Sequence, residues 1–566
     1  MSDLQVAQYL FRRLKSIGIE TVFGVPGDYE LALLDFVPEE GLNWIGTPNE
    51  LVGAYAADGY ARQKGAGALV TTFGPGELSA LCGIGGSFCE NVPVLHIVGY
   101  PTRLAQASGE ILHHTLGDLS YEHYRKMSAE LSCATTVLQD AHSAPSEIDR
   151  VLNAMMYHSK PGYIGISEDV ALAKIPTSYL ESKIVTHLPP GNAEVEDMVI
   201  TKIMEKLSSA KTPIIVVDGG AARGSWEKEV SGLIDALKLP CFNTILGKGI
   251  IDESNPLYHG QYAGIGSAPN TIELVESADC VLWLGNLPSD FNTGMFSEHL
   301  SDSVTVIDFQ RFIVKIGEAA YEAKITQLLP RLSEAVKSKL HLQNRGVEAQ
   351  SSKRPKLPQP TTIEQDWLWD RFSSFLQPGD LVVTETGTAQ IGFAQTTLPT
   401  GSHAWTQAVY GSIGYAAGAA AGASVAAKEM GTYKRMVLIT GEGSLQLTVQ
   451  AFAILNRYGI PPIVFILNND GYTVERYFNG MDAAYNQVPK WDYCALFKAF
   501  SPGLETKTFK VESSMELDAL LSNKEFQTAM YPQCVEMIMD AKDLPTTLRD
   551  VFRAKAKEVK AATRSQ

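Results

Sequence analysis

Basic residues are scarce in this chain, and they are concentrated nowhere. Lysine and arginine together number 47 against 63 aspartates and glutamates, which gives a formal net charge of −16. Because phosphate binding along a nucleic acid requires a basic surface, this balance argues against a nucleic-acid partner. The basic pairs that do occur, such as Lys353-Arg354, are short and isolated.

Cysteine pairs, a secretion signal and a strongly apolar run are also missing. The seven cysteines show no Cys-x-x-Cys spacing, so we expect reduced, buried thiols. The N-terminus lacks a basic start followed by an apolar core, and we expect a cytoplasmic protein. Residues 404–427 carry no charge, but their alanines and glycines are only weakly apolar. We therefore expect a buried helix there, and no membrane span.

At 566 residues the chain is long for one hydrophobic core, and two linker-like stretches divide it. Residues 182–196 contain Pro189-Pro190-Gly191, and residues 341–362 are rich in Gln, Ser, Lys and Pro. The predicted domains are residues 1–181, 197–340 and 363–566.

Each predicted domain alternates short apolar strands with helical periodicity, which is typical of parallel sheets covered by helices. The predicted fold class is therefore α/β, with three doubly wound parallel-sheet domains. The expected strands lie near Thr21–Phe23, Ala68–Thr72, Val94–Val98, Tyr163–Ile166, Pro213–Val217, Cys280–Leu284, Val304–Ile307, Leu381–Thr384, Met436–Thr440, Ile463–Leu467 and Cys534–Ile538.

The third domain contains Gly441-Glu442-Gly443-Ser444 and, further on, Asn468-Asn469-Asp470-Gly471. Glycines allow close approach to a phosphate, and carboxylate and amide oxygens are ligands that Mg²⁺ prefers. A helix is expected over Ser444–Arg457 and a buried strand over Pro462–Leu467, which puts both motifs at strand ends. The alternative for the first motif alone is an ordinary turn before a helix.

This pair of motifs resembles the cofactor-binding signature of the thiamine diphosphate enzymes, which opens with Gly-Asp-Gly and closes with Asn-Asn. Glu442 stands where that family usually has aspartate. The extra methylene moves the carboxylate by roughly 1.5 Å, and Mg²⁺ demands a nearly ideal octahedral shell. The three-domain plan resembles the same family, with a pyrimidine-binding domain first and a diphosphate-binding domain last.

In the first domain, Thr47-Pro48-Asn49-Glu50 precedes a helical pattern, and Glu50 read alone would cap that helix. In the thiamine diphosphate enzymes, a glutamate at this place accepts a hydrogen bond from the pyrimidine ring and activates the cofactor. The resemblance therefore assigns cofactor activation to Glu50.

His113 and His114 are adjacent in an expected loop, and either ring could exchange protons near neutral pH. A metal site is the alternative, but the chain offers no partner at the usual zinc spacing. Gly24-Val25-Pro26-Gly27-Asp28 closes the first strand with a tight turn that would present a carboxylate at the sheet edge.

Seven motifs together are similar, in order and spacing, to those of the pyruvate decarboxylase family of 2-oxo acid decarboxylases. They are Gly-x-Pro-Gly-Asp at 24–28, Asn49-Glu50, His113-His114, residues 289–294, residues 385–388, residues 411–414 and residues 469–475.

The resemblance implies a role for each matching residue. The catalytic residues would be Asp28, Glu50, His113, His114 and Glu475. The cofactor contacts would be Glu50, Thr388, Gly411, Ile413, Gly443, Ser444, Asn469 and Tyr472, and Ile413 would wedge the two cofactor rings into a V. The Mg²⁺ ligands would be Glu442, Asn469 and the carbonyl of Gly471. The substrate pocket would be lined by Phe291, Thr386, Gln390, Val474 and Phe478.

The implied enzyme is a carboxy-lyase that uses thiamine diphosphate and Mg²⁺. In that family the thiazolium ylide attacks a 2-oxo acid, CO₂ leaves, and an enamine is protonated and released as an aldehyde. Thr386 favours pyruvate, while Gln390, Val474 and Phe478 differ from the usual residues and leave phenylpyruvate, indolepyruvate or branched-chain acids as alternatives. The family places Glu50 of one subunit against the diphosphate site of another, so at least a homodimer is expected, and tetramers are common.

Three rival classes remain. Acetohydroxyacid synthases and oxalyl-CoA decarboxylases share the fold but lack the His pair. The third is a catalytically degenerate paralogue with a structural role, which Glu442 alone favours.

Overall fold

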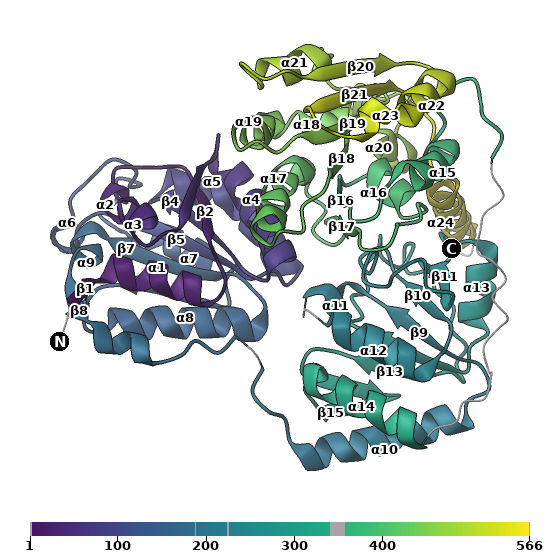
Figure 1. Ribbon diagram of the computed structural model, residues 1–566, viewed down its shortest axis with the longest axis horizontal. Helices are drawn as coiled ribbons and strands as arrows, with labels where there is room; N and C mark the ends of the chain where they lie inside the picture. Colours follow the sequence, from purple (N-terminus) through teal and green to yellow (C-terminus); the bar gives the residue numbers. More distant parts are fainter. Residues whose placement is uncertain (1–2, 187, 224–225, 340–356, 565–566) are drawn as a thin grey trace.

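The computed structural model describes residues 3–186, 188–223, 226–339 and 357–564. Within them, three large sheets follow one another along the chain, each with helices packed against it (Figure 1). A small antiparallel pair, β1 (Asp3–Gln5) and β8 (Lys174–Pro176), joins the start of the first unit to its end.

The first sheet is parallel throughout, with strand order β3-β2-β4-β5-β7-β6. Its strands are β2 (Thr21–Gly24), β3 (Asn43–Gly46), β4 (Gly67–Thr72), β5 (Val94–Tyr100), β6 (Ala134–Leu138) and β7 (Gly162–Ser167). The helices of this unit are α1 (Val6–Ser16), α2 (Leu31–Leu34), α3 (Phe36–Glu39), α4 (Glu50–Lys64), α5 (Pro75–Cys89), α6 (Arg103–Ser108), α7 (His123–Ala129), α8 (Ala144–His158) and α9 (Glu168–Ala171).

The second sheet has the order β11-β10-β9-β12-β13-β14-β15, and its last two strands run antiparallel as an edge hairpin. Its strands are β9 (Pro213–Val217), β10 (Cys241–Asn243), β11 (Tyr258–Gln261), β12 (Cys280–Leu284), β13 (Thr305–Phe309), β14 (Ile313–Ile316) and β15 (Ala319–Glu322). The helices are α10 (Ala193–Ser209), α11 (Gly219–Arg223), α12 (Glu227–Leu237), α13 (Pro269–Glu276) and α14 (Ile325–Lys339).

The third sheet is parallel, with the order β17-β16-β18-β19-β21-β20. Its strands are β16 (Leu381–Thr384), β17 (His403–Trp405), β18 (Met436–Gly441), β19 (Pro462–Asn468), β20 (Lys507–Val511) and β21 (Gln533–Ile538). The helices are α15 (Gln365–Phe375), α16 (Thr388–Phe393), α17 (Tyr415–Glu429), α18 (Glu442–Leu445), α19 (Phe452–Arg457), α20 (Thr473–Phe478), α21 (Tyr493–Ala499), α22 (Ser514–Ser522), α23 (Lys524–Gln527) and α24 (Thr546–Arg564).

The α/β fold class is confirmed, and every strand expected from a short apolar run overlaps an observed strand. The missed strands, such as β6, β14 and β20, are partly exposed and carry no continuous apolar run. The antiparallel hairpin of the second sheet was also not expected. Residues 341–356 of the second predicted linker, including Lys353-Arg354, lie outside the described residues.

Two expected helices differ in extent from those observed. The helix over 444–457 is broken, because α18 ends at Leu445 and α19 begins only at Phe452. Between them the Thr448 hydroxyl donates to the carbonyl of Gly414 at 2.6 Å, and Thr448 has φ −142°. The helix expected over 404–427 begins only at Tyr415, because β17 and a loop occupy the residues before it.

The four-residue glycine spacing in α17 serves packing inside the molecule. A Cβ at Gly422 would lie 1.7 Å from the carbonyl oxygen of Ala56 in α4, and one at Gly418 would lie 2.7 Å from the Cβ of Tyr55. Because only glycine permits this approach, α17 of the third unit packs closely on α4 of the first. In the described part of the chain, no helix has both the length and the apolarity of a membrane span.

All seven cysteines are free thiols, as expected. Their predicted burial holds for Cys241, Cys280 and Cys534, but it is wrong for Cys82, which is exposed on α5.

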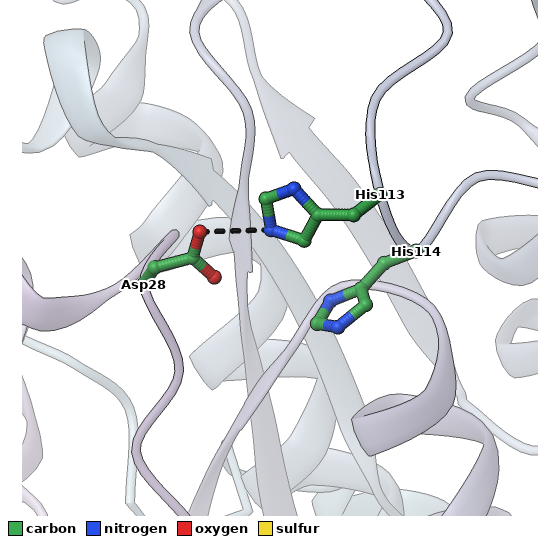
Figure 2. A group of neighbouring side chains, drawn as sticks. All are labelled: Asp28, His113 and His114. Atoms are coloured by element: carbon green, nitrogen blue, oxygen red, sulfur yellow. Dashed lines mark ion pairs between the residues drawn. The ribbon is translucent and has the colours of Figure 1, made fainter.

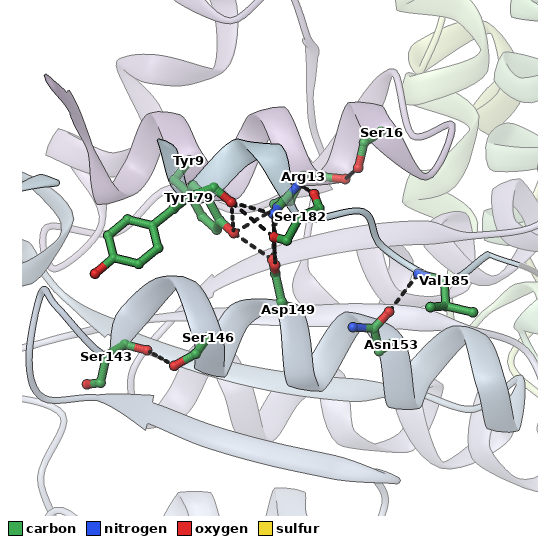
Figure 3. Close-up of polar contacts among 10 residues, drawn as sticks. All are labelled: Tyr9, Arg13, Ser16, Ser143, Ser146, Asp149, Asn153, Tyr179, Ser182 and Val185. Carbon is green, nitrogen blue, oxygen red and sulfur yellow. Dashed lines mark hydrogen bonds and ion pairs between the residues drawn. The ribbon is translucent and has the colours of Figure 1, made fainter. Parts of the chain in front are cut away.

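Arg13 of α1 ties the start of the first predicted linker to the first unit (Figure 3). Its guanidinium pairs with Asp149 of α8 at 2.8 Å and donates to the carbonyl oxygen of Ser182 at 2.8 Å. Asn153 accepts a hydrogen bond from the backbone N–H of Val185 at 2.7 Å. The chain therefore stays attached to the first unit for several residues beyond the predicted boundary at 181.

Candidate active site

Glu442 and Asn469 follow the neighbouring parallel strands β18 and β19, so the strand ends bring them together. Both are almost fully buried, with exposed fractions of 2% and 5%. Glu442 Oε1 accepts a hydrogen bond from the Gly471 N–H at 2.6 Å, and Oε2 accepts one from the Asn469 N–H at 3.4 Å. Burial raises the pKa of Glu442 to about 7.

The side-chain amide of Asn469 turns one terminal atom toward two oxygens. That atom lies 3.1 Å from Glu442 Oε2 and 2.9 Å from the carbonyl oxygen of Gly471. Neighbouring oxygens around Mg²⁺ at its usual bond length lie about 2.9 Å apart. With the amide oxygen on this side, Asn469 would offer Mg²⁺ an oxygen at ligand spacing from Glu442 and from Gly471. The donor set fits Mg²⁺, and the extra methylene of Glu442 is absorbed by its turn toward Gly471.

The residues predicted to contact the cofactor lie around this oxygen cluster or at adjacent strand ends. Gly443 and Ser444 belong to α18, and a Cβ at Gly443 would lie 2.8 Å from the ring of Tyr472, so glycine is required there. Thr388 begins α16 after β16, next to β18 in the sheet. Gly411 and Ile413 lie in the loop before α17, and Ile413 is only half-buried, as a side chain that supports a bound ring would be.

Glu385 is a structural residue of the site that the sequence analysis placed in a motif but gave no role. It is fully buried after β16, and its carboxylate accepts from the Thr386 N–H at 3.0 Å and the Ala416 N–H at 3.2 Å. Burial raises its pKa to about 7. Glu385 thus links the loop that carries Thr388 to the loop that carries Ile413. An acidic residue directly after an apolar strand was the available signal.

Glu50 is the first residue of α4, but it does not cap the helix. The cap is Asn49, whose side chain accepts from the Val52 N–H at 2.8 Å, so the capping alternative for Glu50 is wrong. Glu50 faces α5, since a Cβ at Gly76 would lie 3.3 Å from its Oε1. Its carboxylate is therefore left for another role.

Asp28, His113 and His114 come together at the edge of the first sheet (Figure 2). His113 Nε2 pairs with Asp28 Oδ2 at 2.8 Å, and the hydroxyl of Tyr29 lies 3.3 Å from His113 Nδ1. His114 adopts φ 71°, and its buried Nδ1 has no hydrogen-bond partner. Gly74 allows this arrangement, because a Cβ there would lie 2.5 Å from the His114 carbonyl oxygen.

The metal alternative for the histidines needs a correction, because the fold supplies a third ligand that sequence spacing did not reveal. One ligand atom each from Asp28, His113 and His114 lies within 4.8 Å of the others. However, a 2.8 Å contact between His113 and Asp28 is a direct hydrogen bond, and a zinc ion between them at about 2.0 Å from each ligand would hold these atoms further apart. The geometry favours proton exchange.

Glu30 is a further buried acid in this region that the sequence analysis missed. It is 1% exposed, and its Oε1 accepts from the Gly27 N–H at 2.6 Å. Burial raises its pKa to about 8, and repulsion from Asp28 and Glu50 adds to the effect. Three acids of the first unit therefore interact electrostatically at one edge of the sheet. No motif signalled Glu30, because its burial depends on packing against Gly99.

The predicted substrate residues are only partly brought together. Phe291 of the second unit and Val474 of α20 pack against an apolar cluster that includes Ile391 and residues of α24. Phe478 is exposed on one side and meets the ring of Phe552 edge-on, with centroids 4.7 Å apart.

Gln390 and Thr386 turn toward the loop between β17 and α17. Gln390 is buried and donates to the Thr406 hydroxyl at 2.8 Å, and the hydroxyl of Thr386 donates to the Gln407 carbonyl at 3.3 Å.

Within a single chain, the two groups of predicted catalytic residues lie far apart. The loop with His113 and His114 follows α6, whereas Glu475 is an exposed residue of α20. In Figure 1, α6 lies at the left edge of the molecule and α20 on the right, with α4 and α17 between them. Within one chain, therefore, Glu475 does not reach the histidine pair.

Comparison with known families matches all three units. Residues 4–121 match the thiamine pyrophosphate enzyme N-terminal TPP binding domain, residues 200–332 the central domain, and residues 385–530 the C-terminal TPP binding domain. Thiamine pyrophosphate is another name for thiamine diphosphate. The fold and the site thus define a thiamine pyrophosphate enzyme.

Curated relatives narrow this class. The chain is 42% identical to pyruvate decarboxylase isozyme 3 of Saccharomyces cerevisiae, over 97% of this chain and 98% of that protein. It is 41% identical to a pyruvate decarboxylase of Candida glabrata, over 97% of each chain. The chain belongs to the pyruvate decarboxylase family.

Proposed function

We propose that this protein is a carboxy-lyase that converts pyruvate to acetaldehyde and CO₂ with thiamine diphosphate and Mg²⁺. The observation that carries the proposal is the buried cluster of Glu442, Asn469 and Gly471 within a TPP-binding domain, in which the Asn469 amide lies 3.1 and 2.9 Å from oxygens of the other two residues. The full-length similarity to pyruvate decarboxylases supports pyruvate as the substrate.

The third unit would hold the diphosphate and the metal. Glu442, Asn469 and the Gly471 carbonyl would bind Mg²⁺, while Gly443, Ser444 and Thr388 would line the diphosphate. Ile413, Gly411 and Tyr472 would support the rings. When bound, the cofactor supplies an electron sink for the carbanion that remains after CO₂ leaves.

The first unit would move protons. Glu50 would accept a hydrogen bond from the pyrimidine ring and keep the cofactor activated. His113, oriented by Asp28 and Tyr29, holds a proton at Nε2 or Nδ1 that it can exchange with bound substrate or product. The free Nδ1 of His114 provides a second exchange point. Glu475 would complete the set from α20.

Because Glu475 lies away from the histidine pair in one chain, the complete site requires a second copy. We propose at least a homodimer, with a homotetramer as the assembly that the family favours, in the cytoplasm. Exposed apolar side chains support this assembly, because Leu78 of α5 and, in the loop before α17, Val409 and Tyr410 are 36–41% exposed. A second chain would cover them.

The proposal also concerns which 2-oxo acid is the substrate. Phe291, Val474 and Phe478 would bound an apolar pocket near α24, and Thr386 with the buried Gln390 would limit its depth. The full-length similarity to pyruvate decarboxylases favours pyruvate. Phenylpyruvate, indolepyruvate and branched-chain 2-oxo acids are the alternative substrates.

The direct test is to mix purified protein with thiamine diphosphate, Mg²⁺ and pyruvate and to follow acetaldehyde through NADH loss with added alcohol dehydrogenase. Phenylpyruvate and indolepyruvate are assayed in parallel. Cofactor-dependent turnover of pyruvate above the aromatic acids is expected. Turnover of the aromatic acids alone would contradict the substrate, and no turnover of any of them would favour a degenerate paralogue.

A further inference from the structure

Two cysteines lie on neighbouring elements of the third unit, α21 and β21, and α21 also carries a residue that contacts the proposed metal site. Cys494 is the second residue of α21 and is half-buried, and Cys534 is buried in β21. Interaction between the two side chains lowers the pKa of Cys494 and raises that of Cys534. Cys494 therefore carries the more reactive sulfur of the pair.

The strands beneath α21 explain this proximity. Cys534 pairs with Thr508 of β20, and the Cys494 thiol lies 3.6 Å from the carbonyl oxygen of Phe509, the next residue on that strand. Cys534 faces the same core cluster as Tyr493 and Phe497 of α21. Both sulfurs thus lie on one side of the sheet, between the helix and the strands.

Residues beside both cysteines contact the motifs that would bind the metal and the diphosphate. The hydroxyl of buried Tyr493 donates to the Glu442 carbonyl at 3.2 Å and accepts from Gln446 Nε2 at 2.8 Å. Glu536, two residues after Cys534, accepts from the Asn468 side chain at 2.7 Å. A movement of α21 relative to β21 would therefore shift Tyr493 and change its contact with Glu442.

We infer that Cys494 and Cys534 form a reversible disulfide, and that closing it weakens cofactor binding through Tyr493. Sulfurs in a disulfide lie about 2.05 Å apart, closer than two thiols that are only in contact, so closure draws α21 toward β21. Tyr493 moves with α21, away from its contact with the Glu442 carbonyl. The second half of this inference rests on the proposed function, whereas the disulfide itself does not.

The oxidant is a small disulfide such as oxidised glutathione. The Cys494 thiolate attacks one of its sulfurs, forms a mixed disulfide and releases one glutathione thiolate. Cys534 then loses its proton and attacks the Cys494 sulfur, which releases the second glutathione. The two cysteines together lose two protons and two electrons, and oxidised glutathione is reduced to two thiols.

Thiol mapping on the full-length, cofactor-free protein tests the disulfide. The protein is equilibrated in mixtures of oxidised and reduced glutathione, quenched in acid, denatured, alkylated with iodoacetamide, and digested for mass spectrometry. We expect the Cys494 and Cys534 peptides to be joined and unalkylated, while the buried Cys241 and Cys280 are alkylated. Full alkylation of both Cys494 and Cys534 at the most oxidising ratio would overturn the inference.

Thiamine diphosphate titration at fixed Mg²⁺, followed by tryptophan fluorescence, tests the coupling. Trp491 is a suitable reporter because its ring lies 6.2 Å from that of Tyr493. The dissociation constant should rise about fivefold or more on oxidation and return with dithiothreitol. An unchanged constant in protein with a mapped disulfide would overturn the coupling.

Two serine variants provide the controls. Cys494→Ser should bind the cofactor equally under both conditions. Cys133→Ser, a matched change at another half-buried thiol 3.7 Å from a backbone carbonyl, should keep the redox response. A redox response in Cys494→Ser would also overturn the inference. If the reduced protein fails to bind thiamine diphosphate, the proposed function fails, while the thiol mapping still decides whether the disulfide forms.

Discussion

The two halves of the proposed site differ in how complete they are within one chain. The half at β18 and β19 is buried, and Glu442 is already held by the backbone N–H groups of its neighbours. The half at β2 is open, with the His113 and Asp28 side chains 55% and 54% exposed. One half is preorganised by neighbouring strand ends, whereas the other is open to solvent in the single chain.

This contrast indicates what each half contributes. Metal and phosphate binding need fixed ligands, which adjacent strands provide without outside help. Proton transfer to a substrate needs groups that gain their final environment when a second surface excludes water. The proposed assembly of the site between two copies of the chain would account for this difference.

The largest expected effect comes from the open half. Glu50→Gln should lower kcat by about 10²–10⁴-fold, because a neutral amide cannot keep the cofactor activated. Cofactor affinity should change little, since the diphosphate ligands remain. Steady-state kinetics and a thiamine diphosphate titration measure both quantities. Glu168→Gln, also at the first position of a helix, is the matched control, and an equal loss of activity there would remove the special role of Glu50.

Substitutions in the preorganised half should weaken cofactor binding, whereas those in the open half should lower turnover. Glu442→Ala should weaken metal-dependent binding of thiamine diphosphate by about tenfold or more, because a ligand is lost and the Gly471 N–H loses its acceptor. Glu442→Asp should retain most of the affinity. Calorimetric titration with Mg²⁺ and thiamine diphosphate compares the variants. Unaltered binding in Glu442→Ala would rule out Glu442 as a metal ligand.

In the open half, the burial of Glu30 should make the stability of the folded protein depend on pH. Its pKa is raised from 4.5 to about 8, so its neutral form is the one that suits the folded state. The associated stability is present below about pH 4.5 and is lost as the pH rises toward 8. The melting temperature of Glu30→Gln, measured relative to that of the wild type, should therefore rise by several degrees between pH 5 and 8. A constant difference across that range would contradict the assignment.

The smallest effect concerns substrate size. Gln390→Ala removes the side chain bonded to Thr406 and should raise kcat/KM for phenylpyruvate relative to pyruvate by about tenfold. Steady-state kinetics with both acids measure the ratio. A fall in activity with both acids in equal proportion would place Gln390 outside the pocket.

The preorganised half could be predicted from sequence because its ligands follow apolar strands at short spacing. Glu442 and Asn469 were placed correctly at strand ends even though the helix between them is broken at Thr448. Asp28 and His113, by contrast, are 85 positions apart, and only the sheet order brings them together. Glu30 was missed because its burial, which sets its pKa, comes from packing against distant segments, whereas Glu385 belonged to a recognised motif but was given no role.

The most direct test of assembly across two chains is complementation between inactive variants. Glu475→Gln should also turn over poorly while binding the cofactor. When differently tagged Glu50→Gln and Glu475→Gln chains are co-expressed, mixed dimers should contain one site with both changes and one with neither. Activity should then return to about a quarter of the wild-type value, given random pairing of the two chains. Activity no higher than that of the parent variants, in a preparation with verified mixed dimers, would show that each chain builds its site alone.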